Sequence, residues 1–124
     1  MKLTPKNPPR RYSVGKKGAV EVSDCGTVHL RADEQVTFIT DEGAEYDVMR
    51  KDWGFYATPS LNGRLPQFGL RGALVRNTAS GRYFVCLVEK ESAFLAYLAR
   101  EGLETVIWLD DEEKLNALGY TKLQ

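Results

Sequence analysis

The sequence has little of what catalysis and metal binding usually require. It contains one histidine, His29, and two cysteines, Cys25 and Cys86, in 124 residues. This set offers no zinc-ligand spacing and no Ser-His-Asp or Cys-His arrangement. His29 alternates with Val28 and Leu30, which points it away from a core. We predict no catalytic residue, no metal ion and no cofactor; whether the chain is an enzyme stays open, with the balance against it.

Long hydrophobic runs are also missing. No apolar segment approaches the roughly 20 residues of a membrane-spanning helix, and the N-terminal segment lacks the apolar stretch of a secretory signal. We therefore expect a soluble, cytoplasmic protein that does not contact a membrane. Cys25 lies in a turn-like SDCG segment and Cys86 in an apolar run that predicts burial, and we expect both thiols to be free.

The chain carries no net charge, because 17 lysines and arginines balance 17 acidic residues. This balance counts against a domain that binds nucleic acid through many phosphate contacts. The distribution is uneven: residues 1–17 hold six bases and no acid, whereas residues 101–113 hold six acids and no base. A solvated tail and a solvated helix face explain this split. The alternatives are head-to-tail attraction between protomers and an anionic partner for the N-terminal arm, and we predict a homo-oligomer such as a dimer.

Short strand patterns separated by turn residues predict a mostly antiparallel sheet. A turn at residues 23–26 separates the first two strands, and hairpins at residues 40–44 and 77–81 carry a glycine where the turn needs one. Residues 83–88 are apolar without alternation, which predicts a central strand covered on both faces. The predicted strands are residues 18–22, 27–31, 35–40, 44–50, 70–76, 82–89 and 104–109.

Helix signals concentrate in the last third of the chain. Ser92 and Gly102 mark the start and the end of a helix over residues 93–101, which has one apolar stripe. The strands on either side of this helix are expected to pair in parallel. Asp110 and Glu113 resemble a capping pair that opens a short last helix.

Together these elements predict the α+β class. We expect a single domain with a mixed, mostly antiparallel sheet of about six to seven strands and two to three short helices. Residues 1–17 form a basic, proline-containing N-terminal arm that is ordered only if it docks onto something, and residues 18–124 form the domain.

The stretch KDWGFYATPSLNGRL, residues 51–65, nominates one surface. Thr58 and Pro59 suit the start of a helix, whose free N–H groups attract anions. Cations flank this start, and the aromatic residues Trp53, Phe55 or Tyr56 offer a face on which a sugar or base can stack. The predicted ligand-binding residues are Arg50, Lys51, Trp53, Tyr56, Thr58, Ser60, Asn62 and Arg64.

Several interpretations of this stretch stay open. The same residues would also suit a structural role, in which buried aromatics close one end of a sheet beside a helix cap. The sequence favours this structural alternative. Our functional prediction is a non-catalytic binding or accessory module with a small anionic, sugar-like or nucleotide-type ligand. One alternative is a small enzyme for a phosphorylated or sugar-like substrate, in which Asp110 or Asp111 acts as base or metal ligand and Arg64 binds the anion. A further alternative is a single-stranded nucleic-acid binder, and the zero net charge argues against it.

Overall fold

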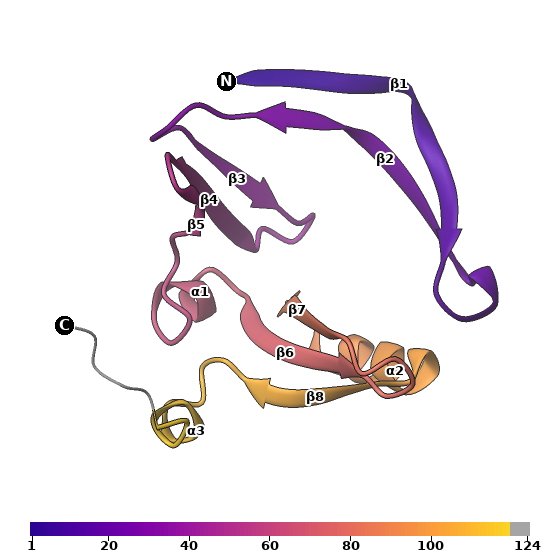
Figure 1. Ribbon diagram of the computed structural model, residues 1–124, viewed down its shortest axis with the longest axis vertical. Helices are drawn as coiled ribbons and strands as arrows, with labels where there is room; N and C mark the ends of the chain where they lie inside the picture. Colours follow the sequence, from indigo (N-terminus) through magenta and orange to yellow (C-terminus); the bar gives the residue numbers. More distant parts are fainter. Residues whose placement is uncertain (120–124) are drawn as a thin grey trace. The chain divides into compact units, whose positions relative to one another are not determined.

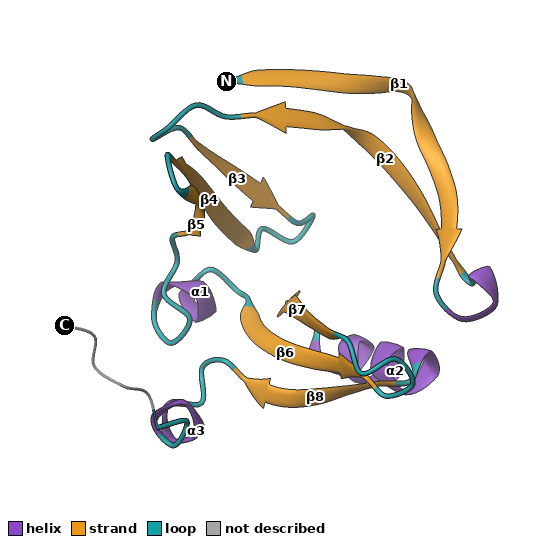
Figure 2. Ribbon diagram, viewed as in Figure 1, coloured by secondary structure: helices purple, strands orange, loops and turns teal. Residues whose placement is uncertain are grey.

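The computed structural model describes residues 1–119 of the chain (Figure 1). Its elements follow in the order β1 (Lys2–Val14), η1 (Lys16–Gly18), β2 (Val20–His29), β3 (Gln35–Ile39), β4 (Glu45–Lys51), β5 (Gly54–Ala57), α1 (Arg64–Gln67), β6 (Arg71–Asn77), β7 (Tyr83–Val88), α2 (Glu91–Glu101), β8 (Leu103–Trp108) and α3 (Glu112–Asn116). The strands form three sheets with the orders β1-β2, β3-β4-β5 and β7-β6-β8 (Figure 2). The fold is therefore α+β with mostly antiparallel sheet, and each sheet has fewer strands than predicted.

The chain divides into two compact units. The first contains Met1–Val36 and Val48–Ala57, and the second contains Thr37–Asp47 and Thr58–Gln124. We describe each unit by itself. The prediction of one domain after an N-terminal arm stays a prediction.

In the first unit, β1 and β2 form a long antiparallel ribbon. The predicted turn at residues 23–26 is wrong, because these residues belong to β2 and Cys25 lies inside the strand. Two contacts with β1 explain how this polar segment becomes a strand. Asp24 forms ion pairs with Lys6 and Arg10, and Gly26 lies so close to β1 that an added Cβ atom would be 2.7 Å from the Thr4 carbonyl oxygen.

In the second unit, α2 packs on one face of the β7-β6-β8 sheet. The buried side chains there are Ala73 and Val75 of β6, Val88 of β7 and Leu98 of α2. Cys86, Phe94, Leu103 and Trp108 pack against them. Cys86 is thus half-buried, which raises the pKa of its thiol, and both cysteines are free as predicted. The helix ends at Gly102, which has a left-handed backbone (φ 67°), as the sequence predicted.

A smaller cluster lies beside this core. Ala44, Leu65 and Leu70 are buried, and Tyr46 and Leu87 pack against them. The turn that precedes Ala44 was predicted correctly, since Thr40 accepts a hydrogen bond from the Gly43 N–H at 3.0 Å and Gly43 is left-handed. The second predicted hairpin, between β6 and β7, is also confirmed.

Two predictions about the sheet around α2 are wrong. The strands on either side of the helix, β7 and β8, are not neighbours, because β6 lies between them and pairs antiparallel with both. The apolar strand β7 is an edge strand, and Tyr83, Phe84 and Val85 are exposed rather than covered on both faces. An apolar run without alternation indicates two apolar faces, but it does not tell whether anything covers them.

Helix starts were predicted less well than helix ends. Ser92 lies inside α2, whose first residue is Glu91, and it caps nothing. The cap of α3 is Asp111, not Asp110, since its carboxylate accepts a hydrogen bond from the Lys114 N–H at 3.1 Å. Within residues 1–119, no helix has the length and apolar character needed to cross a membrane.

Candidate functional site

Three aromatic side chains project from the β4-β5 hairpin of the first unit. The strands pair Arg50 with Phe55 and Lys51 with Gly54, which leaves Asp52 and Trp53 as a two-residue turn. Trp53, Phe55 and Tyr56 are 68, 67 and 51% exposed, respectively. The rings of Trp53 and Tyr56 lie 6.2 Å apart between centroids and are tilted by 39°. The interpretation of these residues as buried aromatics that close a sheet is therefore wrong.

The two cations of this hairpin are held differently. The Arg50 guanidinium carbon lies 5.9 Å from the centre of the Phe55 ring, and its Nη1 donates only a long hydrogen bond of 3.5 Å to the Gly54 carbonyl. Lys51 forms an ion pair with Asp33, which raises the pKa of the Lys51 ammonium. Arg50 is thus the cation of this hairpin that is available to a ligand. We call Arg50, Trp53, Phe55 and Tyr56 the aromatic tip.

The turn at the start of α1 does not form the predicted anion site. The helix begins at Arg64 rather than after Thr58 and Pro59, and it has only four residues. Its first N–H groups are already paired, because the Ser60 carbonyl accepts from Gly63 and Leu65 and the Ser60 hydroxyl accepts from Arg64 at 2.8 Å. The serine oxygens thus occupy the position that an anion would take.

The remaining polar residues of this turn bind other parts of the second unit. Arg64 donates a 3.4 Å hydrogen bond to the Thr58 hydroxyl and lies 4.0 Å from the Asp47 carboxylate. Asn62 donates to the Glu112 carboxylate at 2.9 Å.

The eight predicted residues therefore fall into two sets. Arg50, Lys51, Trp53 and Tyr56 belong to the first unit, whereas Thr58, Ser60, Asn62 and Arg64 belong to the second. Phe55 was not among the eight, although it is as exposed as Trp53. The sequence already offered Phe55 as a face for stacking beside Trp53 and Tyr56, and this is the signal that could have added it.

Arg71 binds Asp110, one of the two carboxylates that the enzyme alternative proposes as base or metal ligand. Its guanidinium donates two hydrogen bonds to Asp110, at 2.8 and 2.9 Å, and a third to Glu91 at 2.7 Å. It also lies 4.1 Å from the centre of the Trp108 ring. The Arg71 hydrogen bonds lower the pKa of Asp110, and the two carboxylates raise the pKa of Arg71. Arg71 thus ties β6, the start of α2 and the end of β8 together, a role that sequence reasoning missed.

Metal ligation finds no support in this geometry. The Asp110 carboxylate accepts two hydrogen bonds from Arg71, and Asp111 caps α3. No group of three His, Cys, Asp or Glu side chains within residues 1–119 could hold a metal ion.

Comparison of the chain with family models, with curated proteins and with solved structures finds no match. The site must therefore be interpreted from its own geometry.

The Arg71 network makes a prediction about stability and pH. Replacing Asp110 with Asn should lower the free energy of unfolding at neutral pH by about 1.5 to 3 kcal/mol, because charge-assisted hydrogen bonds are lost. The folded pKa of Asp110 is lowered from 3.8, so its contribution is present above that value and is lost as the pH falls through the lowered pKa. Urea unfolding at neutral and acidic pH measures both effects.

The matched control is Glu113→Gln, since Glu113 is a carboxylate within α3 and the hydrogen bonds of Arg71 go to Asp110 and Glu91 instead. It should change stability at neutral pH by no more than about 0.5 kcal/mol. If acid lowers the free energy of unfolding of Asp110→Asn as much as that of the wild type, Asp110 is not the source of the acid sensitivity.

Proposed function

We propose that this chain is a non-catalytic binding module whose ligand contacts the aromatic tip. The observation that supports this proposal is the exposure of Trp53, Phe55 and Tyr56 on one short hairpin. Large aromatic side chains at a surface are unfavourable in water, and each buries roughly 150 to 250 Å² when covered. A ligand that covers them recovers this free energy, so the tip is suited to binding.

The chemistry of the tip favours a small ligand with a flat ring and a negative charge. A sugar or base can stack on Trp53 in the turn or on Phe55, beside whose ring the Arg50 guanidinium lies, and Arg50 can donate hydrogen bonds to a phosphate or carboxylate. These properties describe a sugar-phosphate or nucleotide-type ligand. A single strand of nucleic acid shares them but would need more cations along its path, because Lys51 is already paired with Asp33.

The enzyme alternative has less support than binding. Its proposed base, Asp110, has a lowered pKa, which makes it a poor proton acceptor near neutral pH. Arg64, its proposed anion clamp, lies beside Asp47 and Thr58. We therefore keep the chain as a binding module, and a cytoplasmic location stays a prediction.

We also propose that the module self-associates, with a dimer as the simplest closed form. Two observations support this. No described side chain of the first unit is buried, so that unit has an incomplete core. The charges of residues 1–17 and 101–113 are opposite, which favours contact between two copies.

A titration followed by tryptophan fluorescence tests the ligand site. The chain has two tryptophans, so the Trp108→Phe variant reports on Trp53 alone. Nucleotides, nucleotide sugars and sugar phosphates are the probes, and we expect at least one to change the emission of Trp53. Calorimetry without the Trp108→Phe substitution should show that Trp53→Ala weakens binding of that probe by about tenfold or more relative to the wild type. The reason is that stacking on an aromatic ring contributes roughly 1 to 3 kcal/mol.

Tyr83→Ala is the control, because Tyr83 is an aromatic residue of similar exposure in the second unit. It should leave the affinity unchanged. If no probe changes the emission of Trp53, or if both alanine variants lose affinity equally, the aromatic tip is not the ligand site. Binding of single strands that falls steeply with salt would support the nucleic-acid alternative instead.

Sedimentation equilibrium tests self-association. We expect a mass above 13.9 kDa at low salt and a shift toward the monomer as salt screens the opposite charges. A monomer at every concentration and salt would overturn this proposal and leave the ligand proposal intact.

A further inference from the structure

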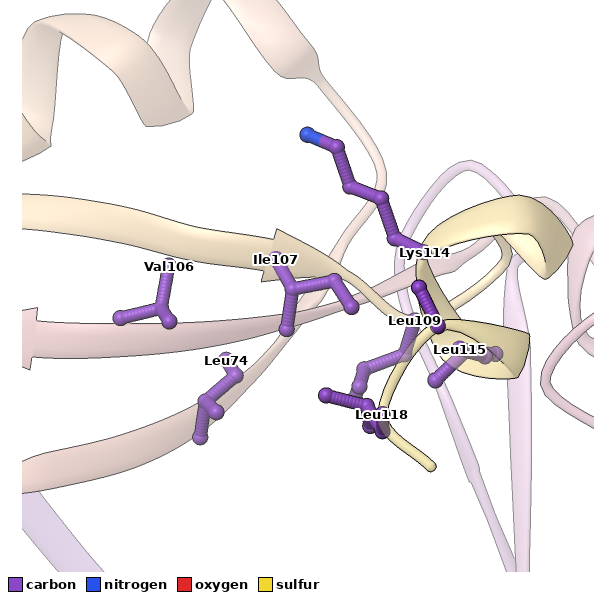
Figure 3. Close-up of a pocket in the computed structure, with 8 residues that line it drawn as sticks. Leu74, Val106, Ile107, Leu109, Lys114, Leu115 and Leu118 are labelled. Atoms are coloured by element: carbon purple, nitrogen blue, oxygen red, sulfur yellow. The ribbon is translucent and has the colours of Figure 1, made fainter. Parts of the chain in front are cut away.

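The second unit contains a groove whose chemistry differs from that of the aromatic tip. The groove lies between β8 and α3 and has a volume of about 400 Å³ (Figure 3). Its lining is apolar apart from Lys114, and the other lining residues are Leu74, Val106, Ile107, Leu109, Leu115, Ala117 and Leu118. No aromatic residue among residues 1–119 lines it. The tip, rather than this groove, therefore fits a ligand that combines a ring with an anion.

Lys51 lies on the same side of the β4-β5 hairpin as two rings of the aromatic tip. Opposite residues of an antiparallel pair share a face, and so do alternate residues of one strand. The register pairs Met49 with Tyr56, so Lys51, two residues after Met49, lies on the Tyr56 side. The Trp53 ring lies beside the Tyr56 ring. A cation and two rings are thus present on this side of the hairpin.

The two sides of the hairpin offer a ligand different charges. Arg50 and Phe55 are paired on the opposite side, where the Arg50 guanidinium lies over the Phe55 ring. On the Tyr56 side, Lys51 Nζ donates a hydrogen bond to the Asp33 carboxylate at 2.5 Å. A ligand on this side meets an ion pair, whereas a ligand on the opposite side meets the Arg50 cation.

The backbone of Asp33 is fixed against β4. The Asp33 N–H donates to the Arg50 carbonyl at 2.6 Å, and the Arg50 N–H donates to the Glu34 carbonyl at 2.9 Å. Asp33 has a left-handed backbone (φ 67°), which glycine adopts most readily and which Asn tolerates as well as Asp does. The backbone alone therefore does not require a carboxylate at this position.

The ion pair of Asp33 with Lys51 is also not explained by stability. The Asp33 side chain is exposed, and exposed ion pairs contribute little to the free energy of folding. Asp33 nevertheless raises the pKa of the Lys51 ammonium more than Asp52, the residue next to Lys51, does. The main effect of the Asp33 carboxylate is thus to neutralise Lys51.

We propose that Asp33 determines the charge specificity of the aromatic tip. By pairing with Lys51 it leaves Arg50 as the cation that a ligand meets, so the tip takes a ring with one phosphate or carboxylate and excludes a chain of phosphates. A single nucleotide or a sugar phosphate has this composition, whereas a single strand needs a further cation for its next phosphate. This inference rests on the proposed function and adds the residue that sets which ligand is bound.

Two probes with the same base test this specificity. They are thymidine 5′-monophosphate and a thymidine strand of about ten nucleotides, which differ in the number of phosphates. Asp33→Asn removes the charge and suits the left-handed backbone. We expect it to strengthen binding of the strand by about fivefold or more, because Lys51 then contacts a phosphate, and to change binding of the monophosphate by no more than about twofold.

The salt dependence of strand binding gives a second readout. A plot of the logarithm of the binding constant against the logarithm of the salt concentration should become steeper by about 0.7 in Asp33→Asn, as expected for one added phosphate contact with a single strand. Calorimetry at several salt concentrations measures the affinity and this slope. Circular dichroism checks folding, and Asp33→Gly, which removes the same charge and also suits the backbone, should give the same result.

Two further variants separate the role of Asp33 from a general change in charge. Glu21→Gln removes an acid of the same unit that pairs with Arg11, and it should leave both affinities unchanged. Asp33→Asn combined with Lys51→Gln should lose the gain for the strand. If the single variant leaves the salt slope unchanged, or if the double variant keeps the gain, Asp33 does not set the specificity.

Failure of this inference can be told apart from failure of the ligand site. A strand that binds Asp33→Asn no better than the wild type overturns the inference, whichever probe the wild type binds. The proposed function then stands as long as one probe changes the emission of Trp53 and loses affinity in Trp53→Ala. If no probe changes that emission, both the ligand site and the role of Asp33 are wrong.

Discussion

Few side chains of this chain are buried, and this limits how the structure can be stabilised. Within residues 1–119, the buried apolar residues are Ala44, Leu65, Leu70, Ala73, Val75, Val88, Leu98 and Ile107, and all of them belong to the second unit. This unit has a helix on a sheet, and the ion pairs of Arg71 join the strand, helix and turn that meet at one end of it. The first unit has strands but no core, so its stability has to come from a surface outside itself. This constraint supports the proposed self-association more directly than the charge pattern does.

Much of the fold could be predicted from local sequence, and the failures have one physical origin. Turns at Gly43 and Gly81 and the helix end at Gly102 were predicted because left-handed glycines carry their own signal. The place of β6 between β7 and β8 was not predicted, since strand order depends on contacts distant in the sequence. The local sequence around Asp24 predicts a turn, because the ion pairs of Asp24 with Lys6 and Arg10 involve another strand. In both cases the local structure is set by contacts with other segments rather than by the residues of the segment itself.

The candidate site divides in the same way. The sequence nominated Trp53 and Tyr56 because aromatics, glycines and cations crowd together there. The same residues would be expected whether the aromatic side chains are buried or exposed. The exposure of the tip comes from its place on a hairpin without a core beneath it. Ser60 was expected to bind a ligand, whereas its oxygens bind the first N–H groups of α1. The enzyme alternative gave Asp110 the role of base or metal ligand, whereas Arg71, 39 residues earlier, pairs with it. Partners at such separations leave no local trace in a sequence.

The central claim is that a second copy completes the first unit. Amide hydrogen exchange across a series of protein concentrations tests it most directly, because only an intermolecular cover depends on concentration. We predict that the amides of β1 and β2 are protected at high concentration and lose this protection on dilution, while the amides of β6 keep theirs throughout. Protection of β1 and β2 that does not change with concentration would contradict the account.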